Sequence, residues 1–166
     1  SKVAQCLAAT LAYRMWARDA RVPHGSRVKR ITVRWVKGLY PDISTEHAKA
    51  AALRAMLPWV ASVALAHKRS ESVLHSSAEV QRVAELRATC LGALQQLDAT
   101  YAGQPRFLSS EQEQQATQHC TAALQALREL TRLLPAGPYK LTPKCHALQH
   151  VVLDSALQNP RHAHCY

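Results

Sequence analysis

The chain has 166 residues, 48% of them hydrophobic, and a formal net charge of +10 at pH 7. This length favours one domain with a packed core. The five cysteines are odd in number and scattered without a CxxC pair, which excludes a disulfide framework and favours reduced thiols in a nuclear or cytoplasmic protein. No secretory signal is visible, and the start without Met is compatible with a fragment of a longer protein.

The positive charge is concentrated in the first part of the chain. Residues 1–70 hold 13 Lys/Arg and 3 Asp/Glu, whereas residues 71–166 hold 8 of each. Residues 1–70 are therefore expected to attract a polyanion electrostatically. We expect a single helical domain over residues 1–166, with a basic part at 1–40 and a neutral helical part at 41–166.

The first predicted helix covers residues 2–19. Large apolar residues recur in it every four positions, which predicts one apolar stripe: Val3, Leu7, Leu11 and Met15. Pro23 and Gly25 are expected to end this helix.

A second helix is predicted from Arg27 to Lys37, because Ser26 is a good N-cap and Gly38 a good stop. One face would be apolar and the next basic, the latter formed by Arg27, Arg30, Arg34 and Lys37. The alternative is a strand, since β-branched residues are frequent here.

The remaining predicted elements are also helices. One starts near Thr45 after a turn and holds Pro58, which should kink or split it. The next two are expected to start with capping boxes, Ser76 with Glu79 and Ser110 with Glu113. The last has Pro143 at its first position. The apolar uncharged stretch 55–66 is shorter than the ~20 residues of a membrane span, so we expect no transmembrane segment.

The basic segment is the first candidate site. Six Lys/Arg and no acid lie between Arg21 and Lys37, and such a stripe can follow a phosphate backbone. The candidate nucleic-acid-binding residues are Arg27, Lys29, Arg30, Arg34 and Lys37, with DNA favoured over RNA. The alternatives are an acidic protein, a membrane surface or a solvated helix face. Trp35 lies among these residues, and we expect it in the core rather than stacked on a base.

A Cys/His cluster near the end of the chain is the second candidate site. His146 and His150 are four positions apart and share a helix face. Four residues of this cluster could form a tetrahedral zinc site: Cys145, His146, His150, His162, His164 and Cys165. No zinc-finger spacing is matched, so structural or exposed histidines and no resident cofactor are the favoured interpretation. Cys145, beside Lys144, could also be an activated thiol, although a buried cysteine is the simpler expectation. No other catalytic motif is present, so we predict no catalytic residues.

The segment 141–150, LTPKCHALQH, followed by Asn159-Pro160-Arg161 and Tyr166, resembles a stretch of eukaryotic cut-and-paste transposase-like proteins. In that family a Pro-Lys-x-His-x-x-x-His helix precedes an aromatic and acidic segment that carries a catalytic carboxylate. The matching positions here are Pro143, Lys144, His146 and His150. The chain ends where the acidic segment would begin, so the resemblance implies a helical region without its catalytic acid.

The sequence as a whole predicts an all-α fold, an irregular bundle of five to seven helices. The favoured function is a nucleic-acid-associated helical domain, a non-catalytic piece of a transposon-encoded protein. The alternative is a protein-interaction module that docks its basic half on an acidic partner.

Overall fold

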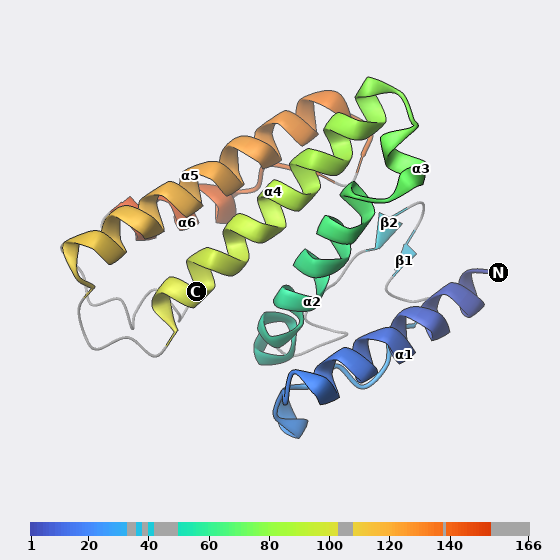
Figure 1. Cartoon of the computed structure of the whole chain (residues 1–166). Coiled ribbons are helices and arrows are strands. Elements are labelled where there is room, and N and C mark those ends of the chain that lie inside the picture. Colours follow the sequence, from blue (N-terminus) through green and yellow to red (C-terminus); the bar gives the residue numbers. More distant parts are fainter. Residues whose placement is uncertain (33–35, 38–39, 42–49, 103–107, 138, 154–166) are drawn as a thin grey trace. The chain divides into compact units, whose positions relative to one another are not determined.

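The computed structural model describes the chain except for residues 33–35, 38–39, 42–49, 103–107, 138 and 154–166 (Figure 1). The described residues form six α-helices, one short 3-10 helix and one pair of two-residue strands. The expected all-α fold with five to seven helices is therefore confirmed. The chain divides into two compact units, Ser1–Val60 and Ala61–Tyr166, and the change in composition expected at residue 40 falls inside the first unit.

The first unit begins with helix α1 (Lys2–Asp19), which Ser1 caps by accepting a hydrogen bond from the Ala4 N–H. The helix ends at Asp19, before Pro23, and Arg21, two residues later, has a φ of 54° in the left-handed region. The Val22 N–H then donates to the Ala17 carbonyl over 2.9 Å. This hydrogen bond, together with a left-handed residue just after the C-cap, is the Schellman motif, in which the left-handed position is usually glycine.

The apolar stripe of α1 does not face the core. Tyr13 and Ala17 are fully buried, and Cys6 and Thr10 lie on the same face. The four residues of the predicted stripe are instead half or more exposed: Val3 at 61%, Leu7 at 53%, Leu11 at 51% and Met15 at 60%. We call these four residues the α1 ridge.

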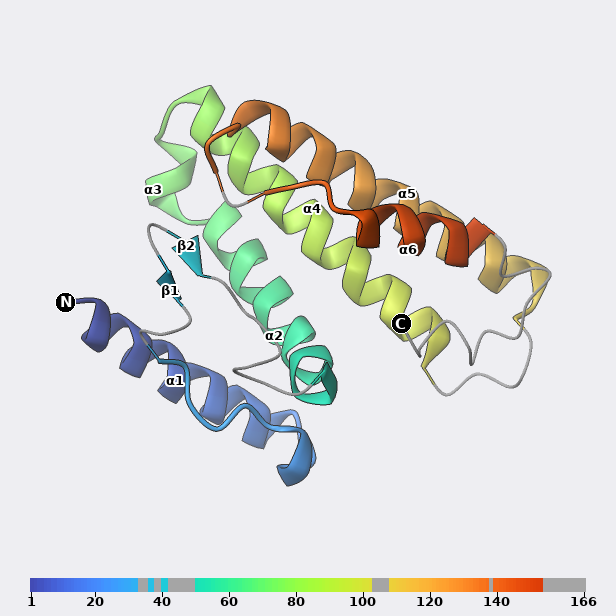
Figure 2. The ribbon, with the colours of Figure 1, turned by 180° about the vertical axis from the view of Figure 1, so that it is seen from behind.

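The predicted helix from Arg27 to Lys37 is wrong. A 3-10 turn, η1 (His24–Ser26), is followed by irregular backbone over residues 27–32, and strand β1 (Val36–Lys37) pairs antiparallel with β2 (Tyr40–Pro41). Of the predicted strand alternative, only Val36–Lys37 is a strand among the described residues. The segment 27–32 runs alongside α1 (Figure 2).

Side chains of α1 bind the backbone of this segment. The Val28 N–H donates to the Tyr13 hydroxyl over 3.3 Å, and the Ile31 N–H donates to the Thr10 hydroxyl over 3.0 Å. The Arg14 guanidinium donates to the Lys29 carbonyl. Because helix α1 already satisfies these peptide groups, the segment does not need a helix of its own to pair them.

Helix α2 (Ala50–Lys68) follows, and it continues through Pro58 as one helix. Its expected start near Thr45 lies outside the described residues. Within the first unit, its residues Ala52 and Met56 pack with Tyr13, Ala17, Val22 and Val28. Trp59 meets Tyr13 edge-on, with ring centroids 5.4 Å apart. In the described part of the chain, α2 is the one helix long and apolar enough to cross a membrane by length and composition alone.

The second unit is built on two long helices, α4 (Ala78–Tyr101) and α5 (Ser110–Leu133), which lie antiparallel and side by side (Figures 1 and 2). The short helix α3 (Glu71–Leu74) precedes them, and α6 (Pro143–Leu153) packs on α5. Two apolar clusters fill this unit. One joins α4, α5 and α6 around Leu97, Cys120 and Val152, and the other joins α4 and α5 around Leu86 and Leu130.

The serine caps of α4 and α5 each lie one residue from the predicted serine, and only α5 has a capping box. Ser77, not Ser76, caps α4, and its side chain accepts from the Val80 N–H. A capping box does begin α5, but it joins Ser109 with Gln112 instead of Ser110 with Glu113. The Ser76 hydroxyl donates to the Val73 carbonyl instead, over 2.6 Å, so it is committed to the end of α3. Pro143 does occupy the first position of α6, as predicted.

Candidate functional site

A pocket of about 540 Å³ lies between the second half of α1 and the segment that runs alongside it, within the first unit. Its apolar lining comes from Tyr13, Met15, Ala17 and Val28. Its polar lining is entirely basic: Arg14, Arg18, His24, Arg27 and Lys29. We call this feature the basic pocket.

The local fold explains why these cations gather. Arg14 and Arg18 are one helical turn apart on α1 and therefore lie on one face. The irregular segment returns along the same helix because Tyr13 binds the Val28 N–H, which brings Arg27 and Lys29 beside that face. Cations from two parts of the sequence thus surround one pocket.

Two of the guanidinium groups are held by backbone carbonyls. Arg14 donates to the Lys29 carbonyl, and Arg27 Nε donates to the Val22 carbonyl over 2.7 Å. A guanidinium has five N–H donors, so each of these contacts orients the group and leaves it donors to spare. Arg18 pairs with Asp19, the one acidic residue in the sequence 1–41, over 3.3 Å, and both side chains are about 70% exposed. Solvent screens such a pair.

The arrangement suits an anion with an apolar part. Several cations around one concave surface attract negative charge, and an arginine can donate to a phosphate or carboxylate in a bidentate manner. The apolar floor offers contact for a sugar, a base or an aliphatic chain.

The structure brings together two of the five predicted nucleic-acid-binding residues. Arg27 and Lys29 line the basic pocket, and Arg30 is exposed nearby in sequence without lining it. Arg34 and the side chain of Lys37 lie outside the described residues, as does Trp35. The predicted arrangement, four cations along one helix face, is wrong because residues 27–32 are not helical.

Sequence reasoning missed Arg14, Arg18 and His24 as members of this site. The spacing of Arg14 and Arg18 on a predicted helix was a usable signal, since side chains four positions apart share a face. No sequence signal indicated that residues 27–32 would return along α1.

Helix α6 separates Cys145 from His146 and His150 of the predicted Cys/His cluster, because the cysteine is half-buried and the histidines are exposed. His146 and His150 are both exposed on α6, with their Nε2 atoms 3.1 Å apart. Cys145 is half-buried and packs against the apolar cluster around Leu97 and Val152. His162, His164 and Cys165 lie outside the described residues. Within the described ranges, no group of three or more Cys, His, Asp or Glu side chains could hold a metal ion.

Two other cysteines are core residues. Burial raises the pKa of the Cys90 thiol to about 11, with a smaller contribution from the nearby Cys145, and burial also raises the pKa of Cys120. A thiol reacts as its thiolate, so these two cysteines are poor nucleophiles at neutral pH.

Comparison with protein-family models, curated protein sequences and solved structures gives no match for this chain. The transposase-like resemblance of residues 141–150 therefore stays a prediction.

Proposed function

We propose that this chain is a nucleic-acid-associated helical protein that binds backbone phosphates at the basic pocket. The observation that carries this proposal is the gathering of Arg14, Arg18, Arg27 and Lys29 around one concave surface. DNA is the polyanion we name first, on the ground of the transposase-like resemblance of residues 141–150. Phosphate contacts position a protein on a duplex without reading its sequence, so the proposed binding is largely sequence-independent.

The charge balance of the chain supports the proposal. Among residues 1–41, the sequence has nine Lys/Arg and one acid, Asp19. A cation that neutralises a phosphate releases condensed counterions, and this release supplies most of the free energy of non-specific binding. Residues 71–166 have equal numbers of acidic and basic residues, so they offer no comparable electrostatic driving force for binding a polyanion.

The test is a salt titration with a labelled 20-base-pair duplex, followed by fluorescence anisotropy. If the four cations each neutralise one phosphate, a plot of log K against log salt has a slope of about −3.6, from about −0.9 per contact. Arg18→Ala and Lys29→Ala should each remove about one contact from this slope.

A matched control comes from the neutral part of the chain. Arg128→Ala and Arg132→Ala remove exposed arginines of α5, so they change the net charge equally and should leave the slope unchanged. Equal losses in the control and pocket variants would reject the basic pocket as the binding site. Absence of binding to duplex at low salt would reject the function itself.

A second candidate function rests on a different observation, the exposed α1 ridge. Four large apolar side chains in line on one helix are typical of a surface that packs against another helix. Lys2 lies beside the start of this ridge, and Arg14 and Arg18 lie beside its end. These charges favour an acidic amphipathic helix as the partner and disfavour a second copy of this basic helix. The chain would then be a protein-interaction module.

This alternative is tested with a synthetic amphipathic peptide that carries leucine on one face and glutamate beside it. The double variant Leu7→Gln/Leu11→Gln should abolish its binding, and Lys29→Ala should leave the binding nearly unchanged. Val80→Gln, which removes an exposed apolar residue of α4, is the control. An affinity that the ridge variant does not change would contradict the interaction-module interpretation.

A further inference from the structure

His146 and His150 form a close pair of imidazoles on the surface of α6. Their Nε2 atoms are 3.1 Å apart, their ring centroids are 4.3 Å apart, and the rings are nearly perpendicular, at 85°. Both side chains are exposed. The pair therefore presents two nitrogen donors at one point of the surface.

The distance between these nitrogens fits one metal ion. An ion about 2.0–2.1 Å from each nitrogen, with the nitrogens 3.1 Å apart, subtends an N–metal–N angle of about 95–100°. This value lies between the right angle of neighbouring ligands in an octahedral complex and the tetrahedral angle. The separation of the two nitrogens thus allows both to bind one ion.

The surroundings of the pair define what kind of site this would be. Imidazole ligands suit zinc, copper and nickel better than calcium or magnesium. Cys145 is not a third ligand, because it packs towards the apolar cluster around Leu97 and Val152 and its Sγ lies 3.7 Å from the Thr142 hydroxyl. Among the described residues no third Cys, His, Asp or Glu joins the pair.

We propose that His146 and His150 together chelate one divalent transition-metal ion through their Nε2 atoms. Such a site differs from a closed tetrahedral zinc site, which takes four protein ligands and holds its ion firmly. An ion chelated by residues four apart also links two successive turns of α6 and stabilises that helix. The site shares no residue with the basic pocket, which belongs to the first unit.

The test is titration of the untagged full chain with Ni²⁺, followed by isothermal calorimetry. Nickel is chosen because it prefers imidazole to carboxylate and does not oxidise thiols. We expect one Ni²⁺ per chain, and at least a tenfold loss of affinity in either His146→Ala or His150→Ala. His75→Ala, which removes an exposed histidine elsewhere in the second unit, should leave the affinity unchanged.

A repositioning variant separates chelation from the mere presence of histidines. His146→Ala combined with Lys144→His keeps two histidines on α6 but places them six positions apart, on different faces of the helix. This variant should bind as weakly as His146→Ala, although it also loses a repelling positive charge. Affinity equal to that of the unmodified chain would overturn the proposal.

His162, His164 and Cys165, the members of the predicted Cys/His cluster that lie outside the described residues, need a variant of their own. His162→Ala/His164→Ala/Cys165→Ser, in the full chain, should retain at least a third of the Ni²⁺ affinity if the pair alone holds the ion. A larger loss, with His146 and His150 intact, would overturn the two-ligand site in favour of a larger cluster. Circular dichroism of each variant without metal shows whether the fold is preserved.

Discussion

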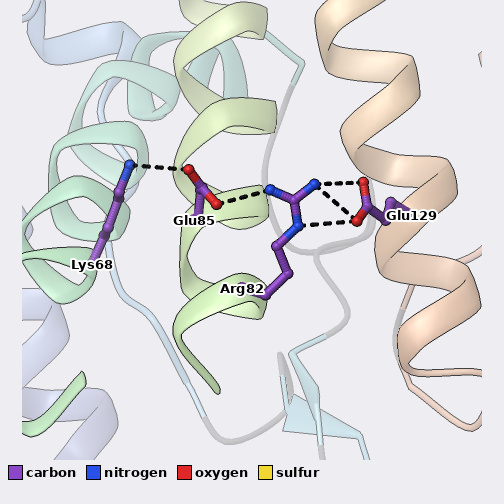
Figure 3. Close-up of polar contacts among 4 residues, drawn as sticks. All are labelled: Lys68, Arg82, Glu85 and Glu129. Carbon is purple, nitrogen blue, oxygen red and sulfur yellow. Dashed lines mark hydrogen bonds and ion pairs between the residues drawn. The ribbon is translucent and has the colours of Figure 1, made fainter. Parts of the chain in front are cut away.

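Arg82 of α4 and Glu129 of α5 form a bidentate ion pair between two helices, with Nε–Oε1 and Nη2–Oε2 distances of 3.0 and 2.8 Å (Figure 3). Arg82 also donates to Glu85, one turn further along α4, and Lys68 lies 3.8 Å from the other oxygen of Glu85. Four charged side chains of α2, α4 and α5 thus form one network within the second unit. Each is 38–46% exposed, so salt screens the network.

The network predicts a pH dependence through Glu85. The hydrogen bond from Arg82, followed by the charge of Lys68, lowers the pKa of Glu85 in the folded chain. A lowered folded pKa means that the carboxylate stabilises the fold above its unfolded pKa, and this contribution is lost as the pH falls through the folded pKa. The free energy of unfolding should therefore decrease with acidification more steeply in the unmodified chain than in Glu85→Gln.

The measurement is urea denaturation of both proteins from pH 2 to pH 6, at low and at high salt. The difference between them should be small, present at pH 6, and reduced in 1 M salt because the groups are exposed. A difference that does not change with pH would show that Glu85 gains nothing from Arg82 and Lys68.

The capping serine of α5 gives a prediction with a built-in control. Ser109 accepts from the Gln112 N–H, whereas its neighbour Ser110 is the first residue of the helix. Ser109→Ala should lower the free energy of unfolding by about 1 kcal/mol, and Ser110→Ala should have almost no effect because alanine favours the helix. Chemical denaturation measures both. The reverse order would place the cap at Ser110.

The left-handed residue at the end of α1 predicts a stabilising substitution. Arg21 adopts a φ of 54°, a conformation that costs a residue with a Cβ about 1 kcal/mol. Arg21→Gly should therefore raise the free energy of unfolding of the first unit by up to about 1 kcal/mol. Arg18→Gly, inside the same helix, removes the same charge and should destabilise by about 1 kcal/mol. Equal losses in both variants would argue against the left-handed closure.

Burial of the Cys90 thiol predicts that it is alkylated slowly in the folded chain. Burial raises its pKa to about 11 in the folded chain, so almost none of it is thiolate at pH 8. Alkylation by iodoacetamide, followed site by site with mass spectrometry, should label the half-buried Cys145 well before Cys90. In urea this difference should disappear. Rapid labelling of Cys90 in the folded chain would show that its cluster opens easily.

The same group makes the stability of the fold depend on pH in the alkaline range. A folded pKa above the unfolded value means that Cys90 stabilises the fold fully below the unfolded pKa. This contribution is lost as the pH rises through the folded pKa of about 11. The free energy of unfolding of Cys90→Ala should accordingly change less over this alkaline range than that of the unmodified chain.

Local sequence determined most of the helices, because helix starts and stops depend on neighbouring residues. Serines near both long helices, the apolar spacing behind them, and Pro143 indicated the starts of α4, α5 and α6 to within one residue. Neighbouring serines offer the same capping chemistry, so the sequence did not distinguish Ser109 from Ser110 as the cap. The spacing of His146 and His150 likewise determined that they meet, because four positions on a helix are one turn.

Tertiary contacts decided the conformation of residues 27–32 and the buried face of α1, which the sequence pattern did not determine. Residues 27–32 carry helix and strand signals of similar strength, and their conformation was settled by Thr10, Tyr13 and Arg14, which bind their peptide groups from another part of the chain. The same contacts bury the Tyr13 face of α1 and leave the α1 ridge exposed, although the ridge is the more apolar stripe. The amount of positive charge could be read from the sequence. Its gathering around one pocket depends on a return of the chain that no local spacing encodes.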